Sequence, residues 1–168
     1  MRRTLETLLQ VQREGFFERF AIGGAVAAAY YVEAVVTEDL DIFAFLKPGA
    51  GGLIDLEPLY ARLRELGGEP RDEHVVIAGW PVQILPAYSP LVEEAVLEAR
   101  DCKYEDLAVP VLAPEYLCAI ALQTARAKDF ARVHSFVTEG AVDAGRLKAL
   151  VERFSLVLRW REYERRYV

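Results

Sequence analysis

Two short stretches decide the fold of this chain: Phe20-Ala-Ile-Gly-Gly24-Ala-Val-Ala-Ala-Ala-Tyr30 and Thr37-Glu-Asp39-Leu-Asp41-Ile-Phe-Ala-Phe45. In the first, a Gly-Gly pair opens an apolar segment that we expect to be a helix. In the second, an Asp-x-Asp pair stands at the start of an apolar segment that we expect to be a strand. Residues i and i+2 of a strand point to the same face, so Asp39 and Asp41 should project together, roughly 7 Å apart at their Cα atoms.

These residue types suit the binding of a metal and a phosphate. Two carboxylates on one face can hold Mg²⁺, which prefers one or two carboxylates together with substrate phosphates. Gly24 would lie at a helix N-terminus, where free N–H groups and the helix dipole attract phosphate. The pair of stretches therefore predicts nucleotide chemistry.

The combined pattern resembles the nucleotidyltransferase superfamily of DNA polymerase β type, whose signature is a helix-opening Gly-Gly or Gly-Ser followed by Asp-x-Asp. Within it, roughly residues 18–135 are similar to a minimal branch that contains the AbiEii-like toxins of toxin–antitoxin pairs. The resemblance implies an α/β chain with the minimal nucleotidyltransferase fold, that is, a small mixed sheet followed by a C-terminal helical cap. It also implies that Asp39 and Asp41 bind Mg²⁺ or Mn²⁺, and that Gly23 and Gly24 bind the phosphates of an NTP.

Hydrophobic periodicity predicts the order of helices and strands. A single domain should span residues 1–168, with an α/β core in 1–100 and a mostly helical cap in 101–168. Helices are expected at 4–15, 25–31, 53–66, 91–99, 114–125, 129–137 and 143–158. Strands are expected at 20–22, 40–46, 74–77 and 81–85, with a loop at 47–52 and an irregular segment or short strand at 104–112.

A second group of polar residues lies at Arg126, Lys128 and Asp129, and it resembles the Lys-Asp-containing helical segment of the toxin-like branch. Lys128 could pair with phosphate oxygens, Arg126 could do so bidentately, and Asp129 could act as a base. Thr37 could also bond a phosphate. The alternatives are a solvated helix start with ordinary ion pairs and, for Thr37, a simple turn residue.

The superfamily pattern places a third carboxylate, normally the general base, on a later strand. The matching strand here reads Trp80-Pro-Val-Gln83-Ile-Leu-Pro86, with Gln83 where the acid is expected. A neutral amide cannot accept the proton of an attacking hydroxyl and is a poor Mg²⁺ ligand. His74 and His134 have no catalytic partner in the sequence and are predicted to be structural.

Composition limits the classes of function. The chain has 168 residues, of which 53% are hydrophobic and 27% charged, as in an ordered globular protein. Its net charge of −6 argues against broad, charge-driven nucleic-acid binding but leaves a local basic patch for RNA open. Apolar stretches too short for a membrane span, the absence of a signal peptide and only two cysteines predict a cytoplasmic protein.

The sequence therefore predicts Mg²⁺-dependent transfer of a nucleoside monophosphate from an NTP to a hydroxyl. The acceptor is left open among RNA such as tRNA, a protein side chain and a small molecule. A toxin would in addition have an antitoxin partner. The rival hypothesis is a nucleotide-binding or interaction module that keeps the fold and has lost catalysis, for which Gln83 is the main support.

Overall fold

The structure is a computed structural model that describes residues 1–33, 37–47 and 54–168. The loop predicted at 47–52 lies outside these residues from position 48 onward. The described helices are α1 (Arg2–Arg13), α2 (Gly24–Ala28), α3 (Glu57–Glu65), α4 (Pro90–Leu97), α5 (Pro114–Thr124), α6 (Ala127–Thr138), α7 (Ala144–Arg153) and α8 (Val157–Tyr167). The strands are β1 (Phe17–Ile22), β2 (Leu40–Leu46), β3 (Glu69–Arg71), β4 (His74–Ile77), β5 (Trp80–Pro86), β6 (Arg100–Tyr104) and β7 (Leu107–Val111).

The strands form one mixed sheet in the order β3-β4-β5-β2-β1-β7-β6. β2 pairs with β5 and β1 with β7 in parallel, whereas the other neighbours are antiparallel. The sheet and the run of helices from α5 to α8 confirm the predicted α/β fold with a small mixed sheet and a C-terminal helical cap.

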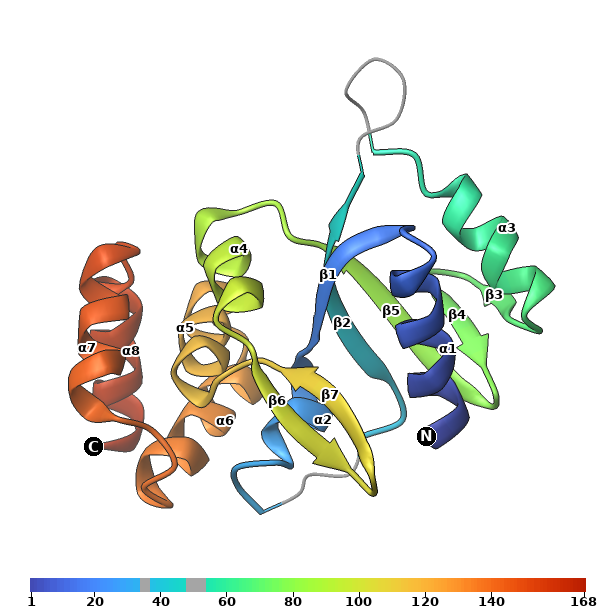
Figure 1. Ribbon diagram of the computed structural model, residues 1–168. Coiled ribbons are helices and arrows are strands. Elements are labelled where there is room, and N and C mark those ends of the chain that lie inside the picture. Colours follow the sequence, from blue (N-terminus) through green and yellow to red (C-terminus); the bar gives the residue numbers. More distant parts are fainter. Residues whose placement is uncertain (34–36, 48–53) are drawn as a thin grey trace.

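Helices cover both faces of the sheet (Figure 1). α1 and α3 pack on one face, and α2, α4 and the cap lie on the other. The central strand β2 shows why both faces are covered: Leu40, Ile42 and Ala44 are fully buried, and Asp41 and Phe43, which alternate with them, are half-buried on the opposite face. Asp41 is thereby directed to the face that carries α2 and the cap.

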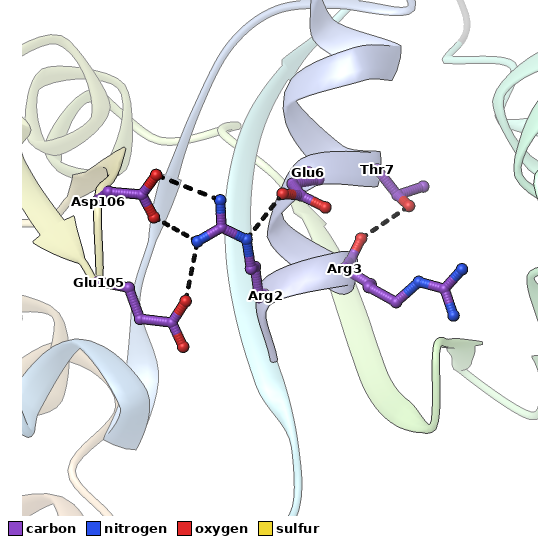
Figure 2. A network of polar contacts seen from close by, with 6 residues as sticks. All are labelled: Arg2, Arg3, Glu6, Thr7, Glu105 and Asp106. Atoms are coloured by element: carbon purple, nitrogen blue, oxygen red, sulfur yellow. Dashed lines mark hydrogen bonds and ion pairs between the residues drawn. The ribbon is translucent and has the colours of Figure 1, made fainter.

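An exposed polar network ties the start of α1 to the β6–β7 turn (Figure 2). The Arg2 guanidinium donates to Glu6 at 3.0 Å, to Glu105 at 2.8 Å and to both carboxylate oxygens of Asp106. Exposed ion pairs of this kind contribute little free energy, typically below about 1 kcal/mol. We therefore expect little contribution from this network to the stability of the fold.

Three regions differ from the sequence-based expectation. Glu69–Arg71 forms a short strand, β3, that was not predicted. Residues Arg100–Val111 form an antiparallel hairpin that extends the sheet beside β1, so the purely helical part begins at Pro114. The helix predicted at 143–158 is two helices, α7 and α8, because the chain turns at Ser155, whose φ of +58° ends helical geometry. Within the described parts of the chain, no helix has both the length and the apolar character to cross a membrane.

Candidate active site

The Gly-Gly turn joins β1 to α2 and lies against β2. The Gly23 N–H donates to the Asp41 carbonyl at 2.9 Å, so this amide belongs to the sheet and does not face a ligand. A Cβ at Gly23 would come within 2.4 Å of the Phe43 ring, which explains the glycine by packing. The predicted phosphate contact therefore falls to Gly24 and the first amides of α2, which have no partner within the helix.

Gly24 is constrained by its backbone and by its neighbour. Its φ of +59° is a left-handed conformation that favours glycine. A Cβ at this position would lie 2.0 Å from Oδ2 of Asp41. Only glycine allows the Asp41 carboxylate to approach the start of α2 this closely.

Asp39 and Asp41 are both at the start of β2, as predicted. Asp41 is the second residue of β2 (Leu40–Leu46), and Asp39 is the last residue before the strand. The Thr37 hydroxyl donates to Oδ1 of Asp39 at 2.7 Å. Thr37 therefore orients a carboxylate, and its bond to phosphate stays a prediction.

The electrostatics of Asp41 favour a bound cation. Burial raises the pKa of Asp41 above its ordinary value, and the charge of Asp39 raises it further. Electrostatic interactions with Arg132, His74 and Lys128 oppose this rise without cancelling it. A carboxylate that is desolvated beside a second carboxylate gains from any cation brought to the pair.

Gln83 lies beside Asp41, which confirms the predicted strand alignment. The two residues are register partners in the parallel β2–β5 pair, and both line the same cavity. The structure thus places an amide next to the carboxylate pair, where the superfamily pattern has a third acid.

The cavity has a volume of about 330 Å³ and is bounded by β2, β5, α4, α5 and the start of α6. Gly24, Asp39 and Asp41 line it. Three cations from the N-cap and the first two turns of α6 line it as well: Arg126, Lys128 and Arg132. A second hollow of about 360 Å³ shares these carboxylates and cations and is also lined by Thr37.

Arg132 was not singled out as a site residue by the sequence. Its spacing from Lys128 provides a signal, because residues four apart on a helix share one face. If Lys128 faces the cavity, Arg132 on the same face of the helix is expected to face it too.

Asp129 also lines the cavity, but its carboxylate is engaged inside the protein. Oδ2 accepts hydrogen bonds from the Thr124 hydroxyl at 2.8 Å and from the Arg126 Nε at 2.7 Å, and Oδ1 accepts from the Arg126 guanidinium at 3.2 Å. Burial alone would raise the pKa of Asp129, but hydrogen bonds from Arg126 and Thr124 outweigh it and lower the pKa. A carboxylate held in this way is a weak base, so the geometry favours a role in fixing Arg126 over the predicted catalytic role.

The residues present fit a bound Mg²⁺ only together with a substrate. Within the described residues, no three His, Cys, Asp or Glu side chains gather closely enough to hold a metal ion. The donor set is thus two hard carboxylates, Asp39 and Asp41, with room for phosphate and water oxygens in the cavity. Mg²⁺ prefers this division between protein and substrate ligands.

A larger cavity of about 480 Å³ lies elsewhere, among α6, α7 and α8. Its walls are mostly apolar, with Leu147, Val151 and Trp160 among them, and it includes none of the predicted site residues. Its chemistry does not suit a triphosphate, so we place the candidate site at the smaller, charged cavity.

Neither a scan of protein-family models nor a search of the curated proteins finds a match for the sequence. Solved structures do match. The solution structure of the antibiotic-resistance factor ANT(2'')-Ia aligns with a TM-score of 0.55 and 18% identity, over 98% of this chain and 96% of that one. A crystal structure of ANT(2'')-Ia in complex with adenylyl-2''-tobramycin gives a TM-score of 0.55 and 19% identity, over 92% and 95% of the two chains.

An antigenic nucleotidyltransferase-like protein from Paracoccidioides brasiliensis also aligns, with a TM-score of 0.53 and 12% identity, over 89% of this chain and 84% of that one. At such low identities the likeness shows a shared fold. The chain therefore has the fold of nucleotidyltransferases, and its chemistry must be argued from its own residues.

Proposed function

We propose that this protein transfers a nucleoside monophosphate from an NTP to a hydroxyl acceptor, with Mg²⁺ bound between the nucleotide and the protein. One observation carries the proposal. The carboxylates of Asp39 and Asp41, Gly24 at the start of α2, and the cations Arg126, Lys128 and Arg132 line one cavity of about 330 Å³. A triphosphate with its metal needs both signs of charge within a few ångströms, and this cavity is lined by both.

Asp39 and Asp41 would hold the metal. Mg²⁺ at that position would neutralise charge on the transferred phosphoryl group and on the leaving pyrophosphate. The two carboxylates are preorganised, because Thr37 orients Asp39 and the Gly24 backbone leaves room for Asp41.

The cations of α6 would bind the phosphates. Asp129 holds the Arg126 guanidinium by its Nε and one terminal nitrogen, and the remaining N–H groups are left to donate into the cavity. Lys128 and Arg132 add two further positive charges to the lining of the cavity. Charge-assisted hydrogen bonds of this kind are stronger than neutral ones, and a guanidinium adds bidentate geometry.

The acceptor stays a prediction. One structural neighbour, ANT(2'')-Ia, was solved in complex with adenylyl-2''-tobramycin, which supports a small molecule with a free hydroxyl as one acceptor class. Phe43, Leu85 and the exposed Tyr88 give the cavity an apolar rim that could hold a nucleobase or an acceptor ring. RNA, a protein side chain and the toxin role with an antitoxin partner stay predictions as well.

The test is a transfer assay. The protein is incubated with each α-³²P-labelled NTP, Mg²⁺ or Mn²⁺, and separate pools of tRNA, cell protein and small hydroxylated molecules. We expect label to enter one pool with wild type and not with Asp39→Asn or Asp41→Asn. Absence of label with every pool, or equal labelling by wild type and both variants, would contradict the proposal and favour a non-catalytic nucleotide-binding module.

A further inference from the structure

The proposed reaction needs a group that removes the proton from the acceptor hydroxyl, and this inference rests on that proposed function. The carboxylates among the described lining residues of the cavity are Asp39, Asp41 and Asp129. The first two are assigned to the metal, and Asp129 is held by hydrogen bonds from Arg126 and Thr124. Gln83, next to the pair, carries no basic atom.

The register of the sheet places one more side chain, that of His74, in line with those of Asp41 and Gln83. Asp41 is the partner of Gln83 in the β2–β5 pair. In the antiparallel β4–β5 pair Val75 is the partner of Val82, which sets His74 opposite Gln83. Directly opposed residues point to the same face, so the three side chains form one row across β2, β5 and β4.

The row lies on the face that carries the cavity. The neighbouring residues Val75 and Val82 point to the other face and are fully buried, and α1 and α3 contact β4. His74 and Gln83 are half-buried. β4 and β5 lie beyond α4 in Figure 1, at the side of the sheet away from the cap. His74 is not among the residues that line the cavity, whereas Gln83 is, so an acceptor bound over Gln83 would lie between His74 and the carboxylate pair.

The spacing suits a base that acts on an acceptor rather than on the metal. Neighbouring strands are about 4.8 Å apart, so the Cα atoms of His74 and Asp41 are roughly 10 Å apart, with Gln83 between them. An imidazole reaches further from its backbone than a carboxylate does. His74 is near enough to Asp41 to have an electrostatic influence on that carboxyl.

We propose that His74 is the general base of this site. Its imidazole accepts the proton of the acceptor hydroxyl as the hydroxyl oxygen bonds to the α-phosphorus. The bond from that phosphorus to the bridging oxygen breaks, and pyrophosphate leaves with the electron pair. Gln83, between His74 and Asp41, is a positioning residue that can hydrogen-bond the incoming hydroxyl.

The first experiment measures single-turnover transfer and NTP affinity in parallel. His74→Ala should lower the transfer rate by about 10²–10⁴-fold, the range of a lost general base, and leave NTP affinity within about twofold. His134→Gln is the matched control, because that histidine lies on α6 beside Tyr163, with its Nδ1 3.5 Å from the hydroxyl. It should transfer at the wild-type rate.

A rescue variant separates a base from a structural histidine. Gln83→Glu puts a carboxylate one strand nearer the metal pair, and in the His74→Ala background it should restore transfer at least tenfold. If His74→Ala transfers as fast as wild type, or loses NTP affinity in step with rate and is not rescued, His74 is not the base and the proposed function still stands. If wild type binds NTP but transfers to no acceptor, the proposed function fails and this inference falls with it.

A measurement without turnover checks the placement of His74. The chain has only two histidines, so its imidazole NMR signals are few. Adding Mg²⁺ and a non-hydrolysable NTP should shift the His74 signals and leave those of His134 in place. Equal shifts, or a shift of His134 alone, would put the nucleotide elsewhere and overturn the inference.

Discussion

Asp41 and Asp129 line the same cavity, but the pKa values of their carboxyl groups are shifted in opposite directions. Burial and the charge of Asp39 raise the pKa of Asp41. At Asp129 burial is outweighed by hydrogen bonds from Arg126 and Thr124, and the pKa is lowered. The Asp129 carboxylate accepts hydrogen bonds at the start of α6 and contributes to the stability of the fold. No hydrogen bond to the Asp41 carboxylate is found among the described residues, and in the proposed function its partner is the bound metal.

The largest effect expected from this contrast is on transfer. Asp39→Asn and Asp41→Asn each remove a charge that the metal needs, and we expect the rate to fall by about 10³-fold or more, as when a main electrostatic contact of a transition state is lost. Glu38→Gln is the control, since Glu38 is an exposed acid immediately before Asp39. A comparable loss in Glu38→Gln would mean that overall negative charge, and not the Asp pair, drives the reaction.

Gly24→Ala tests the close approach of Asp41. The added Cβ must displace the Asp41 carboxylate, whose Oδ2 would be 2.0 Å away, and we expect transfer to fall by about 10²-fold. Gly140→Ala is the matched control, because Gly140 has a similar φ of +67° with nothing within 4 Å of a new Cβ. Both variants should be destabilised by about 1–2 kcal/mol from backbone strain. If both keep full activity, Asp41 does not need its position against α2.

Asp129→Ala should mainly affect stability. It removes the cap of α6 and the charged hydrogen bonds to Arg126, and we expect the free energy of unfolding at pH 7 to fall by about 2–3 kcal/mol in urea titrations. Because the folded pKa of Asp129 is lowered, the stabilisation exists above the unfolded pKa of about 4 and is lost as the pH falls further. The exposed N-cap variant Asp143→Ala should cost only about 1 kcal/mol. If both variants lose the same free energy of unfolding, Asp129 stabilises the protein no more than an ordinary helix cap does.

The smallest expected effect is a gain in thermal stability rather than a loss. Because the folded pKa of Asp41 is raised, its ionisation opposes folding at neutral pH, and Asp41→Asn should raise Tm by a few degrees; about 1 kcal/mol corresponds to roughly 2–4 °C for a chain of this size. The gain should shrink as the pH falls through the raised pKa of folded Asp41, and it should vanish below the unfolded value of about 4. A lower Tm in Asp41→Asn at pH 7, measured by calorimetry, would show that Asp41 is already paired.

The fold and half of the site could be predicted from the sequence because they depend on short patterns. Gly-Gly before an apolar helix and Asp-x-Asp before an apolar strand fix their local geometry within a few residues. The strand β6 (Arg100–Tyr104) was missed because it is a polar edge strand without an apolar alternation. The break between α7 and α8 was missed because it depends on one residue, Ser155, in a left-handed conformation.

The rest of the site depends on tertiary geometry. Asp129 is satisfied because Ala125, with φ of +53°, turns the chain so that Thr124 and Arg126 reach the same carboxylate. His74 joins the row of Asp41 only through the register of two strand pairs. No spacing in the sequence gives either arrangement.

The central claim is that Asp39 and Asp41 hold a metal–nucleotide complex against the cations of α6. Isothermal titration calorimetry with a non-hydrolysable NTP tests it without knowledge of the acceptor. Wild type should bind the nucleotide at least tenfold more tightly with Mg²⁺ than with EDTA, and Asp39→Asn/Asp41→Asn should lose that difference. Equal binding with and without Mg²⁺, or a Mg²⁺ dependence that survives in the double variant, would contradict the account.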